Sequence, residues 1–495
     1  MQAKLNYDMM ILDRYRLVFL MLILLRFSVA SAQVAKVSFT SSDKDMERAF
    51  NWAKEMALHY KGDNTDPVGY WYEAALPSRF AFCMRDVSHQ SIGAEILGLS
   101  NENLNMFSLF AKNISAAKDW CSYWEINNKG KPAPEDYRND KEFWYNLPAN
   151  FDVLFATWRL YQWTGNKYYI NAPAFVNFQE KTVKEYINAW ALSADSLLKR
   201  PAHLHTPVPY NEKDYFQSCR GLPSYSEGVP NMKTGVDLVA ALYRGLLTYS
   251  DILAAKGRHT EAKLYARKAE LYRLRLEADW WDNKYGRYYT YYTGDGQFRS
   301  DDPAPLLLWF DALKDTVRIR MNMAQLAATK SNIENVSYLP CLFYKNGNWE
   351  QARRNILYLS DPTTSRREYP EVSYAVIEGI VQGLMGVKPD AQTGTITTLY
   401  RTDGQGSATV SNLPVLRTVI SLSHRNDHQS EIINLGKKAF KWKAVFAGNY
   451  RHAMVDSVLL KTKKGTDEQG KINSWVQVIV KPGMRVKVDA KLQAN

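Results

Sequence analysis

The chain has 495 residues, of which 46% are hydrophobic, and this length allows one large domain with an extensive core and a second, smaller domain. Its formal net charge is +12, yet no stretch resembles a nucleic-acid-binding module. The sequence also lacks a glycine-rich phosphate loop, the Ser, His and Asp order of a nucleophilic triad, and a cluster of metal-ligating residues. We therefore expect a protein that requires neither a cofactor nor a metal.

The first 32 residues predict an export signal rather than a part of the fold. Arg14 and Arg16 precede the apolar run LVFLMLILL, and VASAQ supplies small residues at Ala30 and Ala32 for cleavage. This run is too short, and too close to the cleavage site, for a membrane anchor. We expect a secreted or periplasmic protein with no membrane span after the signal is cleaved.

After the signal, VAKVSF at residues 34–39 predicts a short strand, and amphipathic helical stretches with turn-rich loops follow it. Short turns join some neighbouring helices and long aromatic loops precede the others, which groups the twelve stretches as six hairpins. This pattern predicts a mainly α domain over residues 33–390, an (α/α)₆ toroid whose inner helices begin after the long loops. The stretches lie near residues 44–61, 86–99, 102–117, 150–164, 174–198, 233–256, 258–279, 303–314, 316–329, 336–346, 348–359 and 372–386.

The pattern changes near Lys388, where apolar residues begin to alternate with period two. Stretches such as GTITTLYR, AFKWKAVFAG and WVQVIVKPGMRVKVDA stand between Gly, Asn and Asp turns. This alternation predicts a small C-terminal antiparallel β-sandwich domain over residues 391–495. The strand at residues 34–39 is a candidate for an additional strand of that domain.

An adjacent Arg and Asp stand at the beginning of the second helical stretch, in FCMRDVSHQS. Arg85 and Asp86 are costly to bury unless their charges meet partners. A sugar provides such partners, because vicinal hydroxyls accept from a guanidinium and donate to a carboxylate. The alternative is that Asp86 caps the helix and Arg85 forms a structural ion pair.

Composition gives a second reason to consider sugars. Aromatic residues make up 13% of the chain, with 14 Trp and 31 Tyr, and flat aromatic faces stack against sugar rings. The alternative is a large aromatic core. The positive net charge is consistent with an acidic polymer such as a uronate-bearing polysaccharide, or else with ordinary solvated surfaces.

The predicted toroid resembles the six-hairpin glycosidase superfamily, which includes glucoamylases, trehalases, processing α-glucosidases and α-L-rhamnosidases. The first three carry an Arg-Asp pair at the start of the second helix that holds hydroxyls of the terminal sugar, and Arg85-Asp86 matches that motif. SYAVIEGIVQGLMGVKPDAQTG is similar to the twelfth helix of rhamnosidase and phosphorylase relatives, which a small β-domain follows. The chain lacks the trehalase ESGWD motif and the rhamnosidase acidic cluster, so the resemblance does not identify the substrate.

The resemblance also implies a general acid. SEGVPNMKTGVDLVAALYRGL is similar to the glucoamylase stretch in which a Glu acid precedes the sixth helix, and the match places Glu227 in that role. In inverting members, one protonated carboxyl donates its proton to the leaving oxygen, and a second group, a carboxylate, activates water. The alternatives are that Glu227 pairs with Lys233 or an Arg, or that Asp237 is the acid.

For the general base we expect Glu371 or Glu368, both in REYPEVSY before the twelfth helix, where glucoamylase-like enzymes keep their base. The two are three residues apart with a Pro between them, so only one is expected to point inward. The other is expected to pair with Arg366 or Arg367.

Five aromatic residues in the long loops are candidates for stacking on the sugar, and core packing is the alternative for each of them. They are Trp71, Tyr72, Trp144, Tyr145 and Tyr225. Asp301 and Asp302 are candidates for substrate or cation contact, or for a helix cap before Pro303. We expect His89 to satisfy a helix neighbour rather than to act as a base.

These observations predict an exported carbohydrate-active enzyme. We expect it to hydrolyse glycosidic bonds of an oligo- or polysaccharide, an acidic one included, in an exo-acting and inverting manner. One alternative is a polysaccharide lyase that acts on a uronate-containing glycan, with a Tyr or His base and Arg to neutralise the uronate. Another alternative is a non-catalytic glycan-binding protein.

Overall fold

A computed structural model describes residues 36–301, 305–467 and 469–490 of the chain, so the export signal predicted at residues 1–32 lies outside the described residues. About 41% of the chain is helical and about 23% is strand. The helices of eight or more residues are α2 (Lys44–His59), α3 (Met84–Ile96), α4 (Ser100–Lys112), α5 (Ala149–Thr164), α7 (Pro173–Lys181), α10 (Val236–Ala255), α11 (His259–Asp279), α13 (Thr316–Ala328), α14 (Ile333–Lys345), α15 (Trp349–Ser360) and α16 (Pro370–Glu378). The shorter ones are α6 (Tyr168–Asn171), α8 (Ile187–Ala189), α9 (Tyr215–Ser218) and α12 (Leu306–Trp309), and π-helical turns follow α7 (Thr182–Tyr186) and α16 (Gly379–Leu384).

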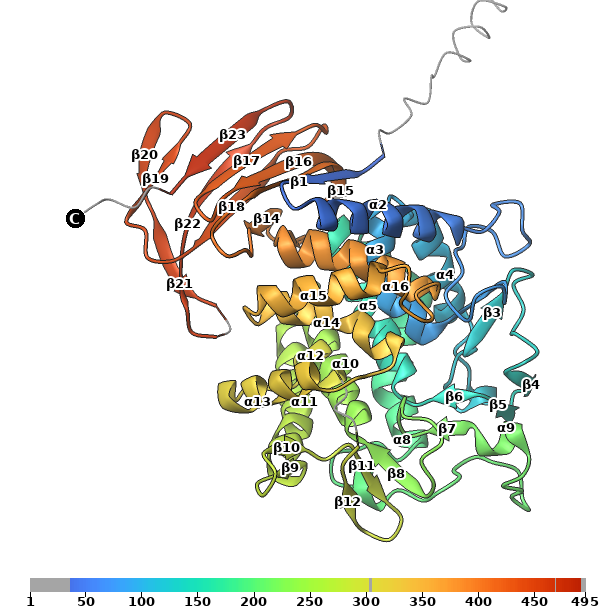
Figure 1. Ribbon diagram of the computed structural model, residues 1–495. Helices are drawn as coiled ribbons and strands as arrows, with labels where there is room; N and C mark the ends of the chain where they lie inside the picture. Colours follow the sequence, from blue (N-terminus) through green and yellow to red (C-terminus); the bar gives the residue numbers. More distant parts are fainter. Residues whose placement is uncertain (1–35, 302–304, 468, 491–495) are drawn as a thin grey trace, which may run out of the picture. The chain divides into compact units, whose positions relative to one another are not determined.

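Six of these helices contact one another in a closed series: α3 packs on α5, α5 on α10, α10 on α12, α12 on α14, α14 on α16, and α16 again on α3 (Figure 1). Five of them follow the longer loops, as the sequence predicted, whereas only residues 329–332 separate α13 from α14. Buried side chains occur around the whole circumference of α3 and α10, as expected for helices enclosed on every side. At Gly93 of α3, a Cβ would come within 2.4 Å of the Tyr374 carbonyl oxygen, so glycine permits the close approach of α16.

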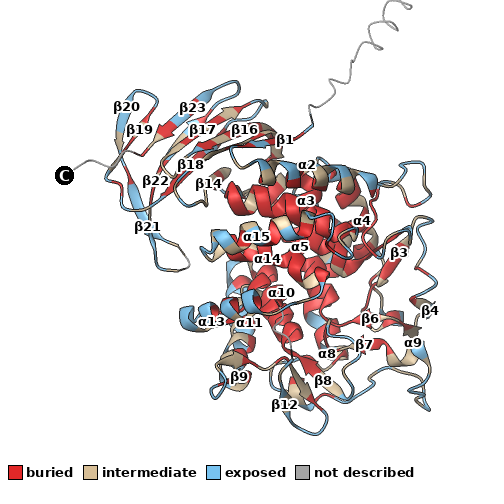
Figure 2. Cartoon of the chain, in the orientation of Figure 1, coloured by how far each residue is buried: buried red, intermediate tan, exposed pale blue. Residues whose placement is uncertain are grey.

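The remaining long helices pack outside this series and are amphipathic. α2 contacts α15 and α16, α4 contacts α3, α11 contacts α10, and α15 contacts α14. The buried residues of α11 recur every three or four positions, which gives one apolar face and one solvated face. Figure 2 shows the difference, with α5 and α10 buried along their lengths and α11 and α13 exposed on one side.

Two predicted helices have different bounds. The stretch predicted over 174–198 ends at Ala189, because Ala191 adopts a left-handed conformation with φ of 51°. The stretch predicted over 303–314 contains only α12, and Asp311 beyond it has φ of 54°. A right-handed helix does not continue through a left-handed residue.

α10 is also the one described helix that is long and apolar enough to cross a membrane by length and composition. In its most apolar window, 78% of the residues are buried inside the protein. Its apolar surface is therefore packed against neighbouring helices, chiefly α5 and α11.

The C-terminal region forms two sheets, of seven and five strands. The seven-stranded sheet has the order β1-β15-β16-β17-β23-β19-β20, and the five-stranded sheet has the order β13-β14-β18-β22-β21. Their bounds are β1 (Ser38–Ser41), β13 (Lys388–Asp390), β14 (Thr395–Leu399), β15 (Ser407–Val415), β16 (Thr418–Arg425), β17 (Gln429–Asn434), β18 (Phe440–Ala447), β19 (His452–Val455), β20 (Val458–Lys461), β21 (Lys463–Thr466), β22 (Ile472–Val480) and β23 (Arg485–Asp489). As expected, the N-terminal strand joins this region, because β1 pairs with β15.

The prediction of a purely antiparallel arrangement is wrong at one pair. β14 and β18 are parallel, whereas the other pairs described in the two sheets are antiparallel. Between them the chain passes through β15, β16 and β17 of the other sheet, and this long connection lets it return in the same direction. The described residues from Val37 onward form one compact unit, so the predicted boundary near residue 390 stays a prediction.

Short strands in the long loops hold the segments that precede the inner helices. They are β2 (Ala81–Cys83), β3 (Glu125–Asn127), β4 (Tyr137–Asn139), β5 (Glu142–Phe143), β6 (Tyr145–Asn146), β7 (Arg220–Leu222), β8 (Met232–Gly235), β9 (Trp281–Asp282), β10 (Arg287–Tyr288), β11 (Tyr291–Thr293) and β12 (Phe298–Arg299). β2 pairs with β3, and β6 pairs with β7, so loops distant in sequence are joined before their helices begin.

Candidate active site

One cavity of about 570 Å³ lies where the long loops meet the beginnings of the inner helices. Its volume is in the range typical of small-molecule sites. Six aromatic residues contribute to its lining, namely Trp124, Trp144, Tyr215, Tyr225, Tyr338 and Tyr369. Its charged lining residues are Arg79, Arg85, Asp86, Glu125, Asp136, Glu227, Asp237, Asp301, Glu334, Arg366 and Glu371.

Five of the six inner helices carry a carboxylate in their first turn. These residues are Asp86 in α3, Asp152 in α5, Asp237 in α10, Glu334 in α14 and Glu371 in α16. The partial positive charge at a helix N-terminus favours a carboxylate there. All of them except Asp152 line the cavity, so several helices direct acidic groups to one place.

The Arg-Asp pair lines this cavity. Arg85 Nε donates to Asp86 Oδ1 at 3.0 Å, and the thiol of Cys83 donates to the other carboxylate oxygen, with 3.1 Å between Sγ and Oδ2. The Arg85 guanidinium also stands over the ring of Tyr225, 5.5 Å from its centroid. The N-cap position of α3 belongs to Cys83 and not to Asp86. Both charges are therefore held in fixed positions on the cavity wall.

Glu371 is buried in the wall, at the first turn of α16 after Pro370. Its side-chain oxygen Oε2 is buried and accepts no hydrogen bond. Burial raises the pKa of Glu371, the nearby Asp86 carboxylate raises it further, and Arg85 opposes the shift. A carboxyl of this kind holds its proton at a pH where an exposed Glu has lost it.

Glu368 is exposed and does not line the cavity. Its backbone carbonyl accepts from the hydroxyl of Tyr60, which anchors the loop before α16. The two glutamates differ in this way because Pro370 begins the helix between them. Among the described ion pairs, neither Glu368 nor Glu371 pairs with Arg366, which instead contacts Glu334 at 3.1 Å.

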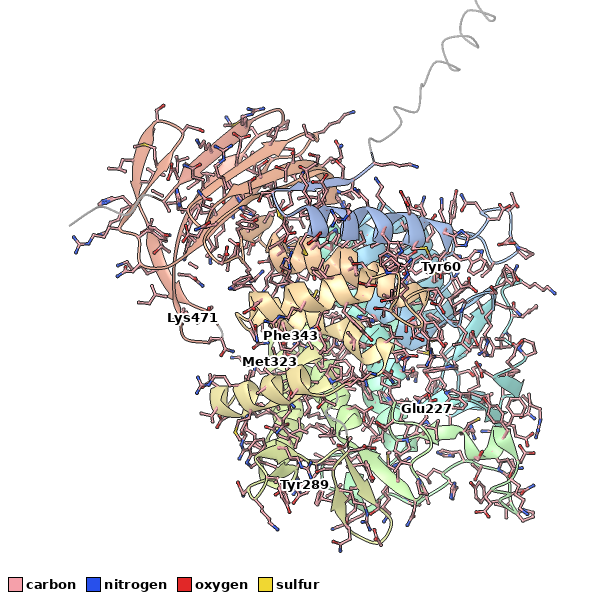
Figure 3. All side chains as sticks on the ribbon, in the orientation of Figure 1. Tyr60, Glu227, Tyr289, Met323, Phe343 and Lys471 are labelled. Atoms are coloured by element: carbon pink, nitrogen blue, oxygen red, sulfur yellow. The ribbon has the colours of Figure 1, made fainter. Side chains whose placement is uncertain are left out.

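Glu227 lies in the loop between β7 and β8 and contributes to the same cavity (Figure 3). The residue is exposed at the cavity edge, and partial desolvation of its carboxyl raises its pKa, while Arg85 acts in the opposite direction. The pairing of Glu227 with Lys233 that the sequence left open is absent from the ion pairs described.

Tyr225 fixes the position of this loop. Its hydroxyl donates to Asp152, and its backbone N–H donates to Asp237 Oδ2 at 2.7 Å. Burial raises the pKa of Asp152 to about 7. Asp237, the competing acid, therefore holds the loop through one oxygen, and its other oxygen Oδ1 is buried without a hydrogen-bond partner.

Of the remaining aromatic candidates, Trp144 lines the cavity and packs against Tyr215, with ring centroids 5.7 Å apart. Tyr145 points away from the cavity and donates to Asn150 at 2.5 Å, because successive residues of an extended segment face opposite sides. Trp71 and Tyr72 are also buried outside the cavity. These three residues therefore pack in the core and are not placed to stack on a ligand in the cavity.

The sequence analysis missed a cluster of three charged lining residues, Arg79, Glu125 and Asp136. Arg79 contacts Glu125 at 2.7 Å and Asp136 at 2.8 Å, which joins two segments of the loops before α3 and α5. Burial and the adjacent Asp136 raise the pKa of Glu125. The two acids stand in WEINNKGKPAPEDYRND with no periodic pattern, so only their contact in space identifies them.

The other candidates are divided between the cavity and the core. Asp301 lines the cavity, and Asp302 lies outside the described residues. His89 is buried, its ring stacks on Tyr338 at 3.7 Å, and burial lowers its pKa well below the usual value. Glu334 in the first turn of α14 also lines the cavity and was overlooked by the sequence analysis. Within the described part of the chain, no group of three His, Cys, Asp or Glu is arranged to hold a metal.

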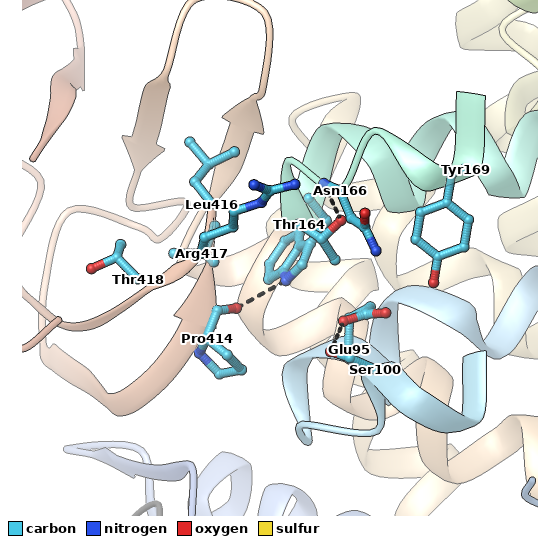
Figure 4. A pocket seen from close by; sticks show the side chains of 11 residues that line it. Glu95, Ser100, Thr164, Asn166, Tyr169, Pro414, Leu416, Arg417 and Thr418 are labelled. Carbon is cyan, nitrogen blue, oxygen red and sulfur yellow. Dashed lines mark hydrogen bonds between the residues drawn. The ribbon is translucent and has the colours of Figure 1, made fainter. Parts of the chain in front are cut away.

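A second cavity of about 400 Å³ lies near the C-terminal ends of α3 and α5, beside the turn between β15 and β16 (Figure 4). Glu95 is the carboxylate in its lining, and burial raises its pKa to about 7. Ser100 and Asn103 donate to this carboxyl at 2.5 and 3.1 Å. One carboxyl cannot provide a separate acid and base, so this cavity does not compete for the catalytic role.

No protein-family model and no curated protein matches the sequence. Solved structures do resemble it. The α-L-rhamnosidase from Dictyoglumus thermophilum is 12% identical with a TM-score of 0.56, over 92% of this chain and 50% of that one. The GH78 family rhamnosidase of Bacillus sp. GL1 is 13% identical with a TM-score of 0.53, over 80% of this chain and 40% of that one.

The α-L-rhamnosidase from Aspergillus terreus is 11% identical, with a TM-score of 0.53, over 91% of this chain and 50% of that one. The chain thus spans half or less of the length of these proteins. At such identities the likeness concerns the fold alone. These neighbours are (α/α)₆ glycosidases, and the chain shares the fold of the six-hairpin glycosidase superfamily.

Proposed function

We propose that the protein is an exported glycoside hydrolase that cleaves an oligo- or polysaccharide from one end with inversion at the anomeric carbon. The observation that carries the proposal is the shared cavity in which Glu227, Glu371 and the Arg85-Asp86 pair stand. Most glycoside hydrolases use a pair of carboxyl groups, one on each side of the bond that is cleaved.

The proposal includes the architecture. The closed series of inner helices, with amphipathic helices outside it, is the (α/α)₆ toroid, and the two C-terminal sheets form a sandwich. In this arrangement the loops before the inner helices gather at one end of the toroid. The cavity at that end is of a size to hold a terminal sugar and its neighbour, which supports exo action.

Arg85 and Asp86 bind hydroxyls of the terminal sugar in this mechanism. The guanidinium donates to one hydroxyl and the carboxylate accepts from the next, and the geometry of the 3.0 Å pair limits which vicinal hydroxyls fit. Tyr225 lies against Arg85, so its ring keeps the guanidinium in place while offering an apolar surface.

Glu227 is the proposed general acid and Glu371 the proposed general base. Glu227 donates its proton to the glycosidic oxygen, and the leaving group departs as an alcohol. In its ionised form, which is populated above its raised pKa, Glu371 removes a proton from a water whose oxygen attacks the anomeric carbon from the opposite face, which inverts its configuration. Glu371 is preferred over Glu368 because it lines the cavity and has an oxygen without a hydrogen-bond partner.

The charge of the cavity supports hydrolysis over the lyase alternative. A lyase needs a cation to neutralise a uronate carboxylate, and each of the three guanidiniums in the described lining already contacts a carboxylate. Eight lining carboxyl groups face these three cations. His89, the histidine one turn from Arg85 in α3, does not line the cavity and so is not placed to serve as a lyase base.

A glycan-panel digest read by mass spectrometry tests the proposal. Hydrolysis adds one water to the products, and elimination does not. Glu227→Gln and Glu371→Gln should each abolish release of the monosaccharide, whereas Glu368→Gln, three residues from Glu371 and exposed, should retain it. Full activity of both Gln variants would overturn the mechanism, and NMR of the first-formed anomer tests inversion.

The leaving group separates the two catalytic roles. Dinitrophenolate departs from a glycoside without being protonated. Glu227→Gln should therefore retain activity on a dinitrophenyl glycoside, whereas Glu371→Gln should not. The opposite result would exchange the roles of the two residues.

The proposed export is tested separately. Terminal sequencing of protein recovered from outside the cytoplasm should begin near Gln33 if the signal is cleaved where the sequence predicts. An N-terminus that retains Arg14 and Arg16 would contradict it.

A further inference from the structure

The outward face of the five-stranded sheet carries an unusual set of side chains. In β18, Trp442, Ala444 and Phe446 are buried on one face, so Lys441 and Lys443 point to the other. The strand register places Ile479 beside Lys441, Gln477 beside Lys443, and Lys463 beside Trp475. We call this surface the lysine-tryptophan face, and it consists of Lys388, Lys441, Lys443, Lys463, Trp475 and Gln477.

Trp475 is the centre of this face. Its ring is partly exposed, and the lysine ammonium groups of two neighbouring strands stand over it. Lys443 Nζ is 4.3 Å from a ring centroid of Trp475, and Lys463 Nζ is 5.1 Å from one. A partly exposed indole with two cations near its rings offers both an apolar and a charged contact.

The lysines of this face lack acidic partners. Among the described residues, none of Lys388, Lys441, Lys443 and Lys463 forms an ion pair with a carboxylate. Asp390 lies on the same face, but its oxygens accept from the backbone of Gln392 at 2.9 Å and from the hydroxyl of Thr393 at 2.7 Å. The one charge of Asp390 opposes four lysines, so the face keeps a net positive charge.

The surroundings increase this charge. From residue 391 to the C-terminus the chain has 16 Lys and Arg against seven Asp and Glu, which accounts for most of the net charge of +12. Burial and the positive charge of Lys388 lower the pKa of Lys443. Crowded cations of this kind gain from an anionic partner, because such a partner removes their mutual repulsion.

We propose that the lysine-tryptophan face binds an anionic polysaccharide, a chain of sugars that carry carboxylate or sulfate groups. The apolar face of one sugar ring stacks on Trp475, and the acidic groups of that sugar and the next pair with Lys443 and Lys463. The face lies outside the catalytic cavity, so this binding is independent of the proposed hydrolysis.

The side chains favour a polysaccharide over a nucleic acid. A single-stranded nucleic acid is usually held by several aromatic side chains along a groove, and this face has one. Phosphate recognition often uses the bidentate fork of arginine, whereas the cations here are lysines. A partly exposed indole between point charges suits a flat ring with charges at its edge.

Affinity electrophoresis of the full chain tests the proposal. The protein is run through gels that contain polygalacturonate, heparin or neutral dextran. We expect retardation by both anionic polymers, none by dextran, and loss of retardation as salt is raised. Polygalacturonate and heparin separate carboxylate from sulfate as the preferred group.

Variants locate the site. Trp475→Ala and the double variant Lys443→Ser/Lys463→Ser should each weaken binding about tenfold or more. The matched control is Lys464→Ser, because Lys464 follows Lys463 in β21 and its register partner Ser474 is buried on the other face of the sheet. It should bind within about twofold of the native protein. Thermal unfolding confirms that each variant is folded.

Three results would overturn the proposal. They are native retention in the Lys443/Lys463 double variant, equal retention by dextran, and retention by DNA that is as strong as by the polysaccharides and unaffected by Trp475→Ala. Activity is not measured in these experiments, so failure of the proposed hydrolysis leaves their outcome unchanged.

Discussion

The cavity and the lysine-tryptophan face concentrate charges of opposite sign. In the cavity, burial and Asp86 raise the pKa of Glu371, and on the sheet, burial and Lys388 lower the pKa of Lys443. Each region thus holds like charges together at a cost to stability, which is typical of sites that meet a ligand. The contrast teaches that the net charge of the whole chain does not describe its cavity, since eight carboxyl groups line a cavity in a protein of charge +12.

The largest expected effect comes from the buried glutamate of the cavity. Glu371→Gln keeps the size of the side chain but removes the base, so kcat should fall by about a thousandfold or more. Steady-state kinetics on a cleaved glycan measure it, and Glu368→Gln should stay within about twofold of the native rate. If the two variants are equally active, the acidic cavity is not the catalytic region and the comparison fails.

The next effect concerns the sugar-binding pair. Asp86→Asn removes the charge that Arg85 contacts and leaves the shape intact, so kcat/KM should fall about a hundredfold. Cys83→Ser is the matched control, because a serine hydroxyl still donates to Asp86 where the thiol does. A loss in Cys83→Ser as large as that in Asp86→Asn would mean that the local fold, rather than the charge, is responsible.

A smaller effect is expected in the pH profile. The base must be ionised, so kcat/KM should rise about tenfold per pH unit until Glu371 loses its proton. Because the Asp86 carboxylate raises the pKa of Glu371, Asp86→Asn should lower it and move this acidic limb to lower pH. The measurement is the position of the limb in the two proteins, and an unmoved limb would show that another group titrates there.

Much of the fold follows from local sequence patterns. Period-3.6 stretches identified the long helices. Loop length distinguished five of the six helices of the closed series from the outer ones, because a longer loop precedes each of those five, whereas α14 follows a short connection. The misplaced features depend on single backbone conformations, such as the left-handed Ala191, or on chain reversals, such as the parallel pair of β14 and β18. Neither leaves a periodic signal in the sequence.

The site was less accessible to sequence reasoning. Arg85, Asp86 and Glu371 stand in the first turns of inner helices and Glu227 in the loop before another, and the structure brings them to one cavity. Their catalytic and binding roles stay predictions. Tyr145, for which core packing was the alternative, lies in the core while its neighbour Trp144 faces the cavity, because one residue changes the side to which an extended segment points.

Charge gave the least reliable inference, because it was read from the whole chain. The acidic lining depends on Glu125 and Asp136 in the segment before α5 and on Glu334 in the first turn of α14, and these residues gain their meaning only when the two segments meet. The basic face depends on the register of β18, β21 and β22, which a sequence without a structure does not provide. The acidic partner that the net charge suggested therefore fits the positively charged lysine-tryptophan face better than the acidic cavity.

The smallest expected effect is the one that separates the two regions most sharply. Lys443→Ser/Lys463→Ser changes a face that contributes no lining residue to the cavity, so turnover of a small aryl glycoside should stay within about twofold of the native value. Turnover of a long anionic polymer should fall at low salt and converge with the native protein at high salt, since the lost attraction is a screened one. Equal losses on both substrates would mean that the face acts on the cavity, and the two regions would then have to be treated as one site.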